Sequence, residues 1–315
     1  MRHRHLLSLL APLLMALAAA HAAAPNAAAS APAPANTSRA VAITIDDLPR
    51  GGDKGPRDLK SLTAMTARLL QPFREQHIPV IGFVNGSRYA DDDAGLRALL
   101  NQWLDAGAQL GNHSYSHLDI NNVPLSQYTA DITRGEEPLR SVLAARQQPL
   151  VYFRHPYLHV GATPEAKQGL AKFLAEKGYI AAPVTFDTAD YAWAAAYMRP
   201  EDHERAARGY LPYMESVVAF FEQRAVQVLG REFPQILLIH ANQLNADQMP
   251  ALLAMFRRRG YRFVTLEEAL RDPSYQSAED YVGRNGFSWL HRWSRAKGLP
   301  NKGEPDPPDW VMKGF

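Results

Sequence analysis

The chain has 315 residues, of which 46% are hydrophobic and 21% charged, so it can bury a large core and is too apolar for a disordered polyelectrolyte. Its formal net charge of +2, without a long basic run, argues against a nucleic-acid-binding protein. The absence of cysteine excludes disulfides, thiolate metal sites and a cysteine nucleophile.

Residues 1–22 have the pattern of a secretory signal peptide. The basic start MRHRH is followed by the apolar run LLSLLAPLLMALAAA and by AHA, a small-x-small cleavage site. The run is shorter than a membrane span requires, which makes an uncleaved anchor the weaker alternative. We expect cleavage near Ala22, an Ala/Pro-rich linker over 23–39, and a periplasmic or secreted protein without a membrane span.

From residue 40 onward, short apolar runs alternate with amphipathic segments. Runs rich in Val and Ile predict buried strands over 40–45, 78–84, 108–111, 150–153, 179–186, 235–239 and 261–266. The helical period predicts helices over 58–76, 92–106, 124–146, 163–177, 211–229 and 247–259. This alternation indicates a parallel α/β fold, and the local pattern leaves an open doubly wound sheet and a closed barrel as alternatives.

The segment 272–315 differs in composition from the single domain expected over 40–271. Its stretches GFSWLHRW and PDPPDW mix aromatic residues with proline and glycine, and we expect an irregular extension that packs on the domain. Trp289 and Trp293 are four residues apart and could stack on a sugar, but packing against the domain is our preferred interpretation.

Polar side chains gather where the predicted strands end. They are Asp46 and Asp47, His113, Arg154, Asp187 and Asp190, and His240. Because the carboxyl ends of parallel strands face one side of the fold, these side chains should share one rim. Their convergence is more informative than any one of them alone.

The pair Asp46-Asp47 could be a plain strand-to-loop turn. Adjacent carboxylates repel each other, so neighbours must stabilise both charges. A divalent cation on one and an arginine beside the other would do so. On extended backbone their side chains point apart, which would allow two different roles.

His113 and His117 are four residues apart, and isolated pairs at this spacing are more often not ligands. Together with one carboxylate they form a His₂Asp set with coordination positions left for water and substrate, as in catalytic metal sites. His240 could be a hydrogen-bonded core histidine or could protonate a leaving group. Arg154 could form a weak surface ion pair or keep a buried aspartate ionised.

Other catalytic motifs are missing from the sequence. HERAA at 203–207 has Ala207 where a zinc-protease helix needs its second histidine. There is no G-x-S-x-G elbow, phosphate loop or dinucleotide fingerprint.

Five segments, in order, resemble the motifs of the polysaccharide deacetylases of the NodB-homology class, carbohydrate esterase family 4. They are TIDD at 44–47, HSYSH at 113–117, RHPY at 154–157, DTADY at 187–191 and LLIH at 237–240. The resemblance covers roughly residues 40 to 270. Ile45 replaces the usual phenylalanine, and Tyr191 follows Asp190 where the family usually has tryptophan. We take Asp190 as the family aspartate, with Asp187 as the alternative.

The resemblance implies a distorted (β/α)₇ barrel with one divalent metal, Zn²⁺ first, with Co²⁺, Ni²⁺ or Mn²⁺ as alternatives. Carried over by residue, Asp47, His113 and His117 would bind the metal.

The resemblance also implies roles for five further residues. Asp46 would be the general base and His240 the general acid. Arg154 would tune Asp46, and Asp190 would orient His240. The backbone N–H of Tyr157 would help to hold the oxyanion.

We therefore expect a hydrolase of linear amides that removes acetyl groups from the amino sugars of a peptidoglycan- or chitin-like glycan. An O-acetyl-glycan esterase or a hydrolase of small N-acyl amides could use the same machinery. A non-catalytic glycan-binding protein could lose a ligand or the base, and here neither is lost. The sequence leaves the oligomeric state open.

Overall fold

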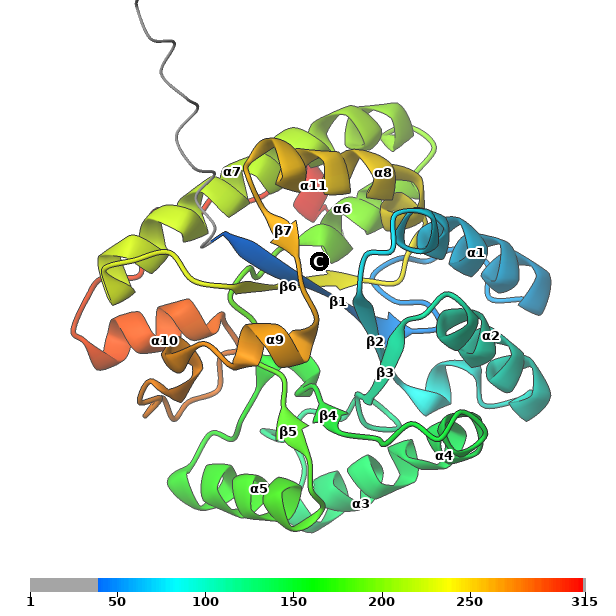
Figure 1. Cartoon of the computed structure of the whole chain (residues 1–315), viewed down its shortest axis with the longest axis horizontal. Coiled ribbons are helices and arrows are strands. Elements are labelled where there is room, and N and C mark those ends of the chain that lie inside the picture. The colour runs from blue at the N-terminus through cyan, green and yellow to red at the C-terminus, as the bar shows by residue number, and fades with distance from the viewer. Residues whose placement is uncertain (1–38, 314–315) are drawn as a thin grey trace, which may run out of the picture. The chain divides into compact units, whose positions relative to one another are not determined.

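The computed structural model describes residues 39–313, so the predicted signal peptide and nearly all of the linker lie outside the described residues. Seven parallel strands form one sheet in the order β5-β4-β3-β2-β1-β6, with β7 paired to the start of β1 (Figure 1). They are β1 (Ala40–Leu48), β2 (Val80–Val84), β3 (Gln109–Asn112), β4 (Tyr152–Phe153), β5 (Ile180–Ala181), β6 (Gln235–His240) and β7 (Arg262–Phe263). Each overlaps a predicted strand.

The chain after β5 connects the two ends of this sheet. Ala182 N–H donates to the carbonyl of Phe153 at 2.8 Å, beside β4. Four residues later, Phe186 forms a parallel bridge with Leu237 of β6. The sheet is therefore curled rather than open, and the expected distorted barrel is confirmed over the doubly wound alternative.

Helices surround the sheet (Figure 1). They are α1 (Leu59–Glu75), α2 (Asp93–Asp105), α3 (Leu125–Gly135), α4 (Glu137–Ala144), α5 (Pro164–Glu176), α6 (Asp190–Tyr197), α7 (His203–Leu229), α8 (Gln243–Arg258), α9 (Leu266–Leu270), α10 (Trp289–Ala296) and α11 (Asp309–Met312). Short 3₁₀ turns are η1 (Gly86–Tyr89), η2 (Pro156–Leu158) and η3 (Pro273–Gln276). Within 39–313, no helix is long and apolar enough to cross a bilayer.

Two helical predictions differ from the structure, and helix α6 was not predicted. The single helix expected over 124–146 is two helices, because Pro138 in the first turn of α4 cannot continue the hydrogen bonding of α3. Helix α7 begins at His203 rather than at residue 211, because its first turns are polar and weakly periodic. Helix α6 was missed because it is buried on nearly all sides, which removes the amphipathic pattern.

Alternation along β1 directs side chains to two sides of the sheet. Val41, Ile43 and Ile45 belong to the large core cluster that includes residues of the outer helices. Ala40 and Ala42 belong to a second cluster made mainly of strand residues. Thr44 and Asp46 continue this second set by the two-residue period. The fold thus turns Asp46 toward the inside of the barrel.

The extension after residue 271 packs on the domain and contains two short helices, α10 and α11, joined by irregular chain. Trp293 is buried against Phe233 and Tyr275, which fits the packing interpretation. Trp289 is half-buried, and its backbone N–H donates to the carbonyl of Val184 at 2.7 Å.

Candidate metal centre and active site

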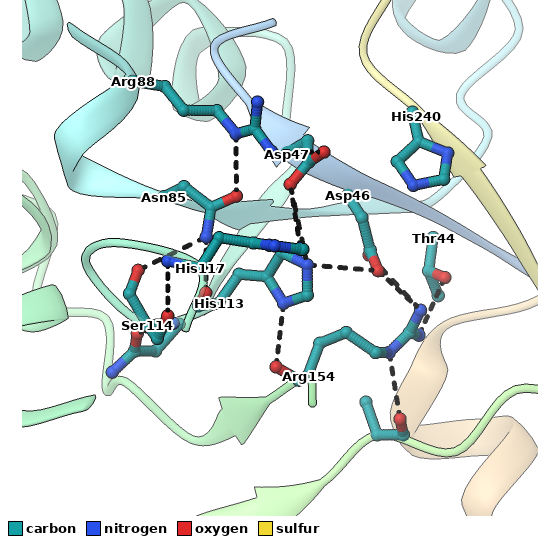
Figure 2. A network of polar contacts seen from close by, with 12 residues as sticks. Thr44, Asp46, Asp47, Asn85, Arg88, His113, Ser114, His117, Arg154 and His240 are labelled. Atoms are coloured by element: carbon teal, nitrogen blue, oxygen red, sulfur yellow. Dashed lines mark hydrogen bonds and ion pairs between the residues drawn. The ribbon is translucent and has the colours of Figure 1, made fainter. Parts of the chain in front are cut away.

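The predicted site residues meet at the carboxyl ends of the strands. Asp46 and Asp47 lie near the end of β1, His113 directly after β3, Arg154 directly after β4, and His240 at the end of β6 (Figure 2). Asp46 and His240 are direct register partners in the pairing of β1 with β6. The expected shared rim therefore exists.

Asp47, His113 and His117, called the metal trio below, place one potential ligand atom each within 4.8 Å of one another. Oδ1 of Asp47 lies 3.7 Å from Nε2 of His113 and 3.6 Å from Nε2 of His117. Asp47 and His113 are buried, and His117 is half-buried. The structure thus brings together the three residues that the sequence predicts as ligands.

Unusual backbone conformations shape this trio. Asp47 and His117 have left-handed φ values of 67° and 54°, a conformation that is uncommon for non-glycine residues and that recurs at active and ligand-binding sites. Asp47 lies where the pairing of β1 with β2 shifts register, so it leaves the alternation of the strand. Gly51 packs against Asp47 so closely that an added Cβ would lie 2.1 Å from the Cβ of Asp47.

The trio directs two imidazole nitrogens and one carboxylate oxygen to one point. Nδ1 of His113 lies 2.8 Å from the carbonyl of Arg154, so this nitrogen carries the proton and Nε2 carries the lone pair. Burial lowers the pKa of both imidazoles, which favours the neutral form that binds metals. Oδ1 of Asp47 is buried without a hydrogen-bond partner in the described chain. These features fit a divalent metal ion.

Asp46 lies between the trio and a buried guanidinium. It is 2% exposed, and Arg154 NH1 approaches its two carboxylate oxygens at 3.3 and 3.2 Å. Arg154 is itself held by the carbonyl of Ala182 and the hydroxyl of Thr44. Burial raises the pKa of Asp46 to about 6, although Arg154 and His240 counteract it.

Asp190 holds His240 at two points. Its Oδ1 lies 2.8 Å from Nδ1 of the imidazole, and its Oδ2 accepts the backbone N–H of His240 at 2.9 Å. Asn245 donates a further bond of 2.7 Å to Oδ2. Burial lowers the pKa of His240, but the contact with Asp190 outweighs it and raises the pKa to about 9. Asp190, not Asp187, is therefore the aspartate bonded to this histidine.

Two tyrosines line the rim. The ring of Tyr157, which is 55% exposed, meets the ring of His117 edge-on at 4.4 Å. Tyr191 lies 6.0 Å from the ring of His240. Trp193 is buried against Tyr213 instead, so Tyr191 forms the part of the rim where the motif usually has tryptophan.

Sequence reasoning missed two polar residues after β2. Asn85 and Arg88 lie at the same end of the sheet as the other site residues, and Arg88 donates to Asp47 Oδ2 at 2.7 Å. The rule that polar residues after strands gather on one rim would have found them.

Comparison with known proteins identifies relatives of one kind. The family model described as polysaccharide deacetylase matches residues 33–173, a range that ends before Asp190 and His240. The chain is 24% identical to a chitin deacetylase of Colletotrichum lindemuthianum over 233 residues, which cover 74% of this chain and 79% of that protein. It is 26% identical to a peptidoglycan-N-acetylglucosamine deacetylase of Bacillus cereus over 242 residues, which cover 75% and 90%.

Solved structures share the fold. The chitin deacetylase from Colletotrichum lindemuthianum superimposes with a TM-score of 0.52 at 21% identity, covering 80% of this chain and 95% of that one. A polysaccharide deacetylase from Bacillus cereus gives a TM-score of 0.50 at 18% identity, covering 72% and 91%.

Proposed function

We propose that this chain, whose residues 33–173 match the polysaccharide deacetylase model, is a metal-dependent hydrolase that removes N-acetyl groups from an amino-sugar polysaccharide or oligosaccharide. We propose a chitin- or peptidoglycan-like glycan as substrate, in the periplasm or outside the cell. The observation that carries the proposal is the metal trio together with the neighbouring Asp46. Oδ2 of Asp46 lies 3.7 Å from Nε2 of His113.

In this proposal Asp47, His113 and His117 hold one divalent cation, Zn²⁺ first, with Co²⁺, Ni²⁺ or Mn²⁺ as alternatives. Two imidazoles and one carboxylate suit Zn²⁺ and leave coordination positions open, as catalytic sites require. A cation bound there would supply Lewis-acid chemistry, lowering the pKa of a bound water and polarising the substrate carbonyl.

Asp46 is the proposed general base, because amide hydrolysis needs a group that takes a proton from water. Arg154 contacts both of its oxygens and favours the ionised form, while burial keeps its pKa near 6, close to the working pH of a base. A carboxylate in bulk solvent would be a weaker base.

His240 is the proposed general acid that protonates the departing nitrogen. Asp190 accepts from Nδ1, which leaves Nε2 as the atom that can reach the substrate. With a pKa of about 9, the imidazole carries its proton at neutral pH. The backbone N–H of Tyr157 would donate to the developing oxyanion, and one such donor is typically worth roughly 3 kcal/mol.

An O-acetyl-glycan esterase or a hydrolase of small N-acyl amides would use the same residues. Tyr191 lies beside His240 at the rim, where the family usually has tryptophan. This difference changes the shape of the rim beside His240, so both alternative substrate classes should be tested. A purely glycan-binding protein is the least favoured alternative, since the trio, the base and the acid are all present.

A substrate panel tests the proposal. Purified residues 23–315 with added Zn²⁺ should release acetate from N-acetylglucosamine oligomers or peptidoglycan faster than from acetylated xylan or small N-acetyl amides. Metal analysis should find one equivalent of cation per chain. Faster release from xylan or the small amides would favour the alternatives. The absence of both acetate release and bound metal would contradict the proposal.

A further inference from the structure

One arginine outside the predicted site residues reaches the metal trio. Arg88 lies in η1, directly after β2, and its NH2 group donates to Oδ2 of Asp47 at 2.7 Å (Figure 2). Its Nε donates to the side-chain oxygen of Asn85 at 3.1 Å. The guanidinium therefore links a proposed metal ligand to the end of a neighbouring strand.

Asn85 extends this link to a second member of the trio. It is fully buried, and its side-chain amide donates to the backbone carbonyl of His113. Its backbone N–H donates to the carbonyl of Leu48, the residue after Asp47, at 3.1 Å. Arg88 and Asn85 thus contact the chain on both sides of the site, at β1 and just after β3.

The contact with Arg88 makes the two oxygens of Asp47 unequal. Oδ2 is occupied by the guanidinium, whereas Oδ1 has no hydrogen-bond partner among the residues described and faces the two imidazole nitrogens. A carboxylate that turned to offer both oxygens to a cation would lose the bond to Arg88. Arg88 therefore favours binding through Oδ1 alone.

The charge of Arg88 and its hydrogen bond should act on a cation in opposite directions. A positive charge repels a nearby cation, but the charge of Arg88 is paired with Asp47 at 2.7 Å and its side chain is 24% exposed, so part of this repulsion is offset. The hydrogen bond, in contrast, is made to the carboxylate of Asp47, and solvent weakens it little because that side chain is only 8% exposed. Loss of partners that orient metal ligands typically lowers affinity about 10- to 100-fold. Orientation should therefore outweigh repulsion.

We propose that Arg88 is a positioning residue of the metal centre, which holds Oδ2 of Asp47 and thereby sets the affinity and coordination geometry of the bound cation. The inference rests on the part of the proposed function that assigns a cation to the trio. The alternative is an ion pair between two loops that stabilises the fold without influencing the metal.

Titration of residues 23–315 with Zn²⁺ and with Co²⁺ separates these two roles. Arg88→Met keeps the apolar stem and removes every donor, and Arg88→Lys keeps the charge with a smaller donor group. Arg88→Met should raise the Kd for Zn²⁺ about 10- to 100-fold and change the visible absorption bands of bound Co²⁺. Arg88→Lys should show a smaller change of both. Arg140→Met, which removes the ion pair between an exposed arginine on α4 and Glu136, the residue before that helix, is the matched control and should change neither.

The outcomes distinguish the two proposals. If the parent protein binds no metal, the proposed function fails together with the inference. If the parent binds metal but Arg88→Met leaves the Kd and the Co²⁺ bands unchanged, or tightens binding, only the inference is overturned. Should Arg88→Met fail to fold by circular dichroism, Arg88→Lys decides, since unchanged Co²⁺ bands in that variant would also overturn it.

Discussion

Asp46 and His240 face each other as register partners on adjacent strands, β1 and β6. Each is also bound to a second charged group that is buried, Asp46 to Arg154 and His240 to Asp190. The proposed base and acid are therefore fixed by sheet pairing and by ion pairs, not by mobile loops. This relationship determines how activity should depend on pH.

The pH dependence of kcat/KM should be bell-shaped. Asp46 acts as a base only when ionised, so activity should fall as the pH drops below its pKa of about 6. His240 acts as an acid only when protonated, so activity should fall as the pH rises above its pKa of about 9. A bound cation would move both limits downward, because positive charge disfavours proton binding. Initial rates from pH 4.5 to 10.5 with saturating metal would measure both limits.

Asp190→Asn tests the origin of the basic limit. The side chain of asparagine keeps the shape of the aspartate but lacks the negative charge that raises the pKa of His240. The basic limit should therefore move to lower pH while the acidic limit changes little. A basic limit that stays in place would mean that another group, not His240, supplies the proton.

His113→Ala should remove the metal before it removes the fold. The substitution deletes one of three ligands, so the Kd for Zn²⁺ should rise at least 100-fold, with deacetylation lost in parallel. Metal content by mass spectrometry and circular dichroism would measure the two effects separately. His203→Ala, at the exposed start of α7, is the control and should retain both metal and activity. Unfolding of His113→Ala without added metal would assign His113 a structural role instead.

The parallel α/β fold and the shared rim could be predicted because they depend on pattern, whereas the choice of a barrel over an open sheet came from the resemblance. Buried parallel strands are continuous apolar runs, and the rule that their carboxyl ends share a rim places Asp46, His113 and His240 together. The resemblance supplied the order of the motifs. The resemblance favoured Asp190 over Asp187, but both follow the same predicted strand, and only distances in the structure show that Asp190 is the one bonded to His240.

The missed features share a physical cause, which is the absence of a local pattern. Helix α6 is buried nearly all round, so its residues show no amphipathic period. The left-handed turn at Asp47 depends on its packing against Gly51, which sequence spacing does not reveal. Arg88 reaches Asp47 from a segment 41 residues away, and such contacts come only from the tertiary fold.

Asp46→Asn should abolish turnover while the metal stays bound. Asparagine has nearly the same shape but cannot accept a proton from water, so kcat should fall by about 10² to 10⁴-fold. Asp47→Asn, the neighbouring change, should instead lose the metal. Zn²⁺ binding measured beside acetate release would compare the two variants. If Asp46→Asn loses the metal, our division of roles between the two aspartates is wrong.

Gly51→Ala should disturb the metal centre through packing alone. An added Cβ would lie 2.1 Å from Cβ and 2.4 Å from Oδ2 of Asp47, so Asp47 must shift and its carboxylate must leave its observed position. We expect a loss of about 1–3 kcal/mol in stability and weaker Zn²⁺ binding. Gly169→Ala in α5 is the control, because its Cβ would meet only the flexible end of Leu125. Thermal melting and Zn²⁺ titration of both variants would check this, and unchanged binding in Gly51→Ala would show that Asp47 does not need its observed position.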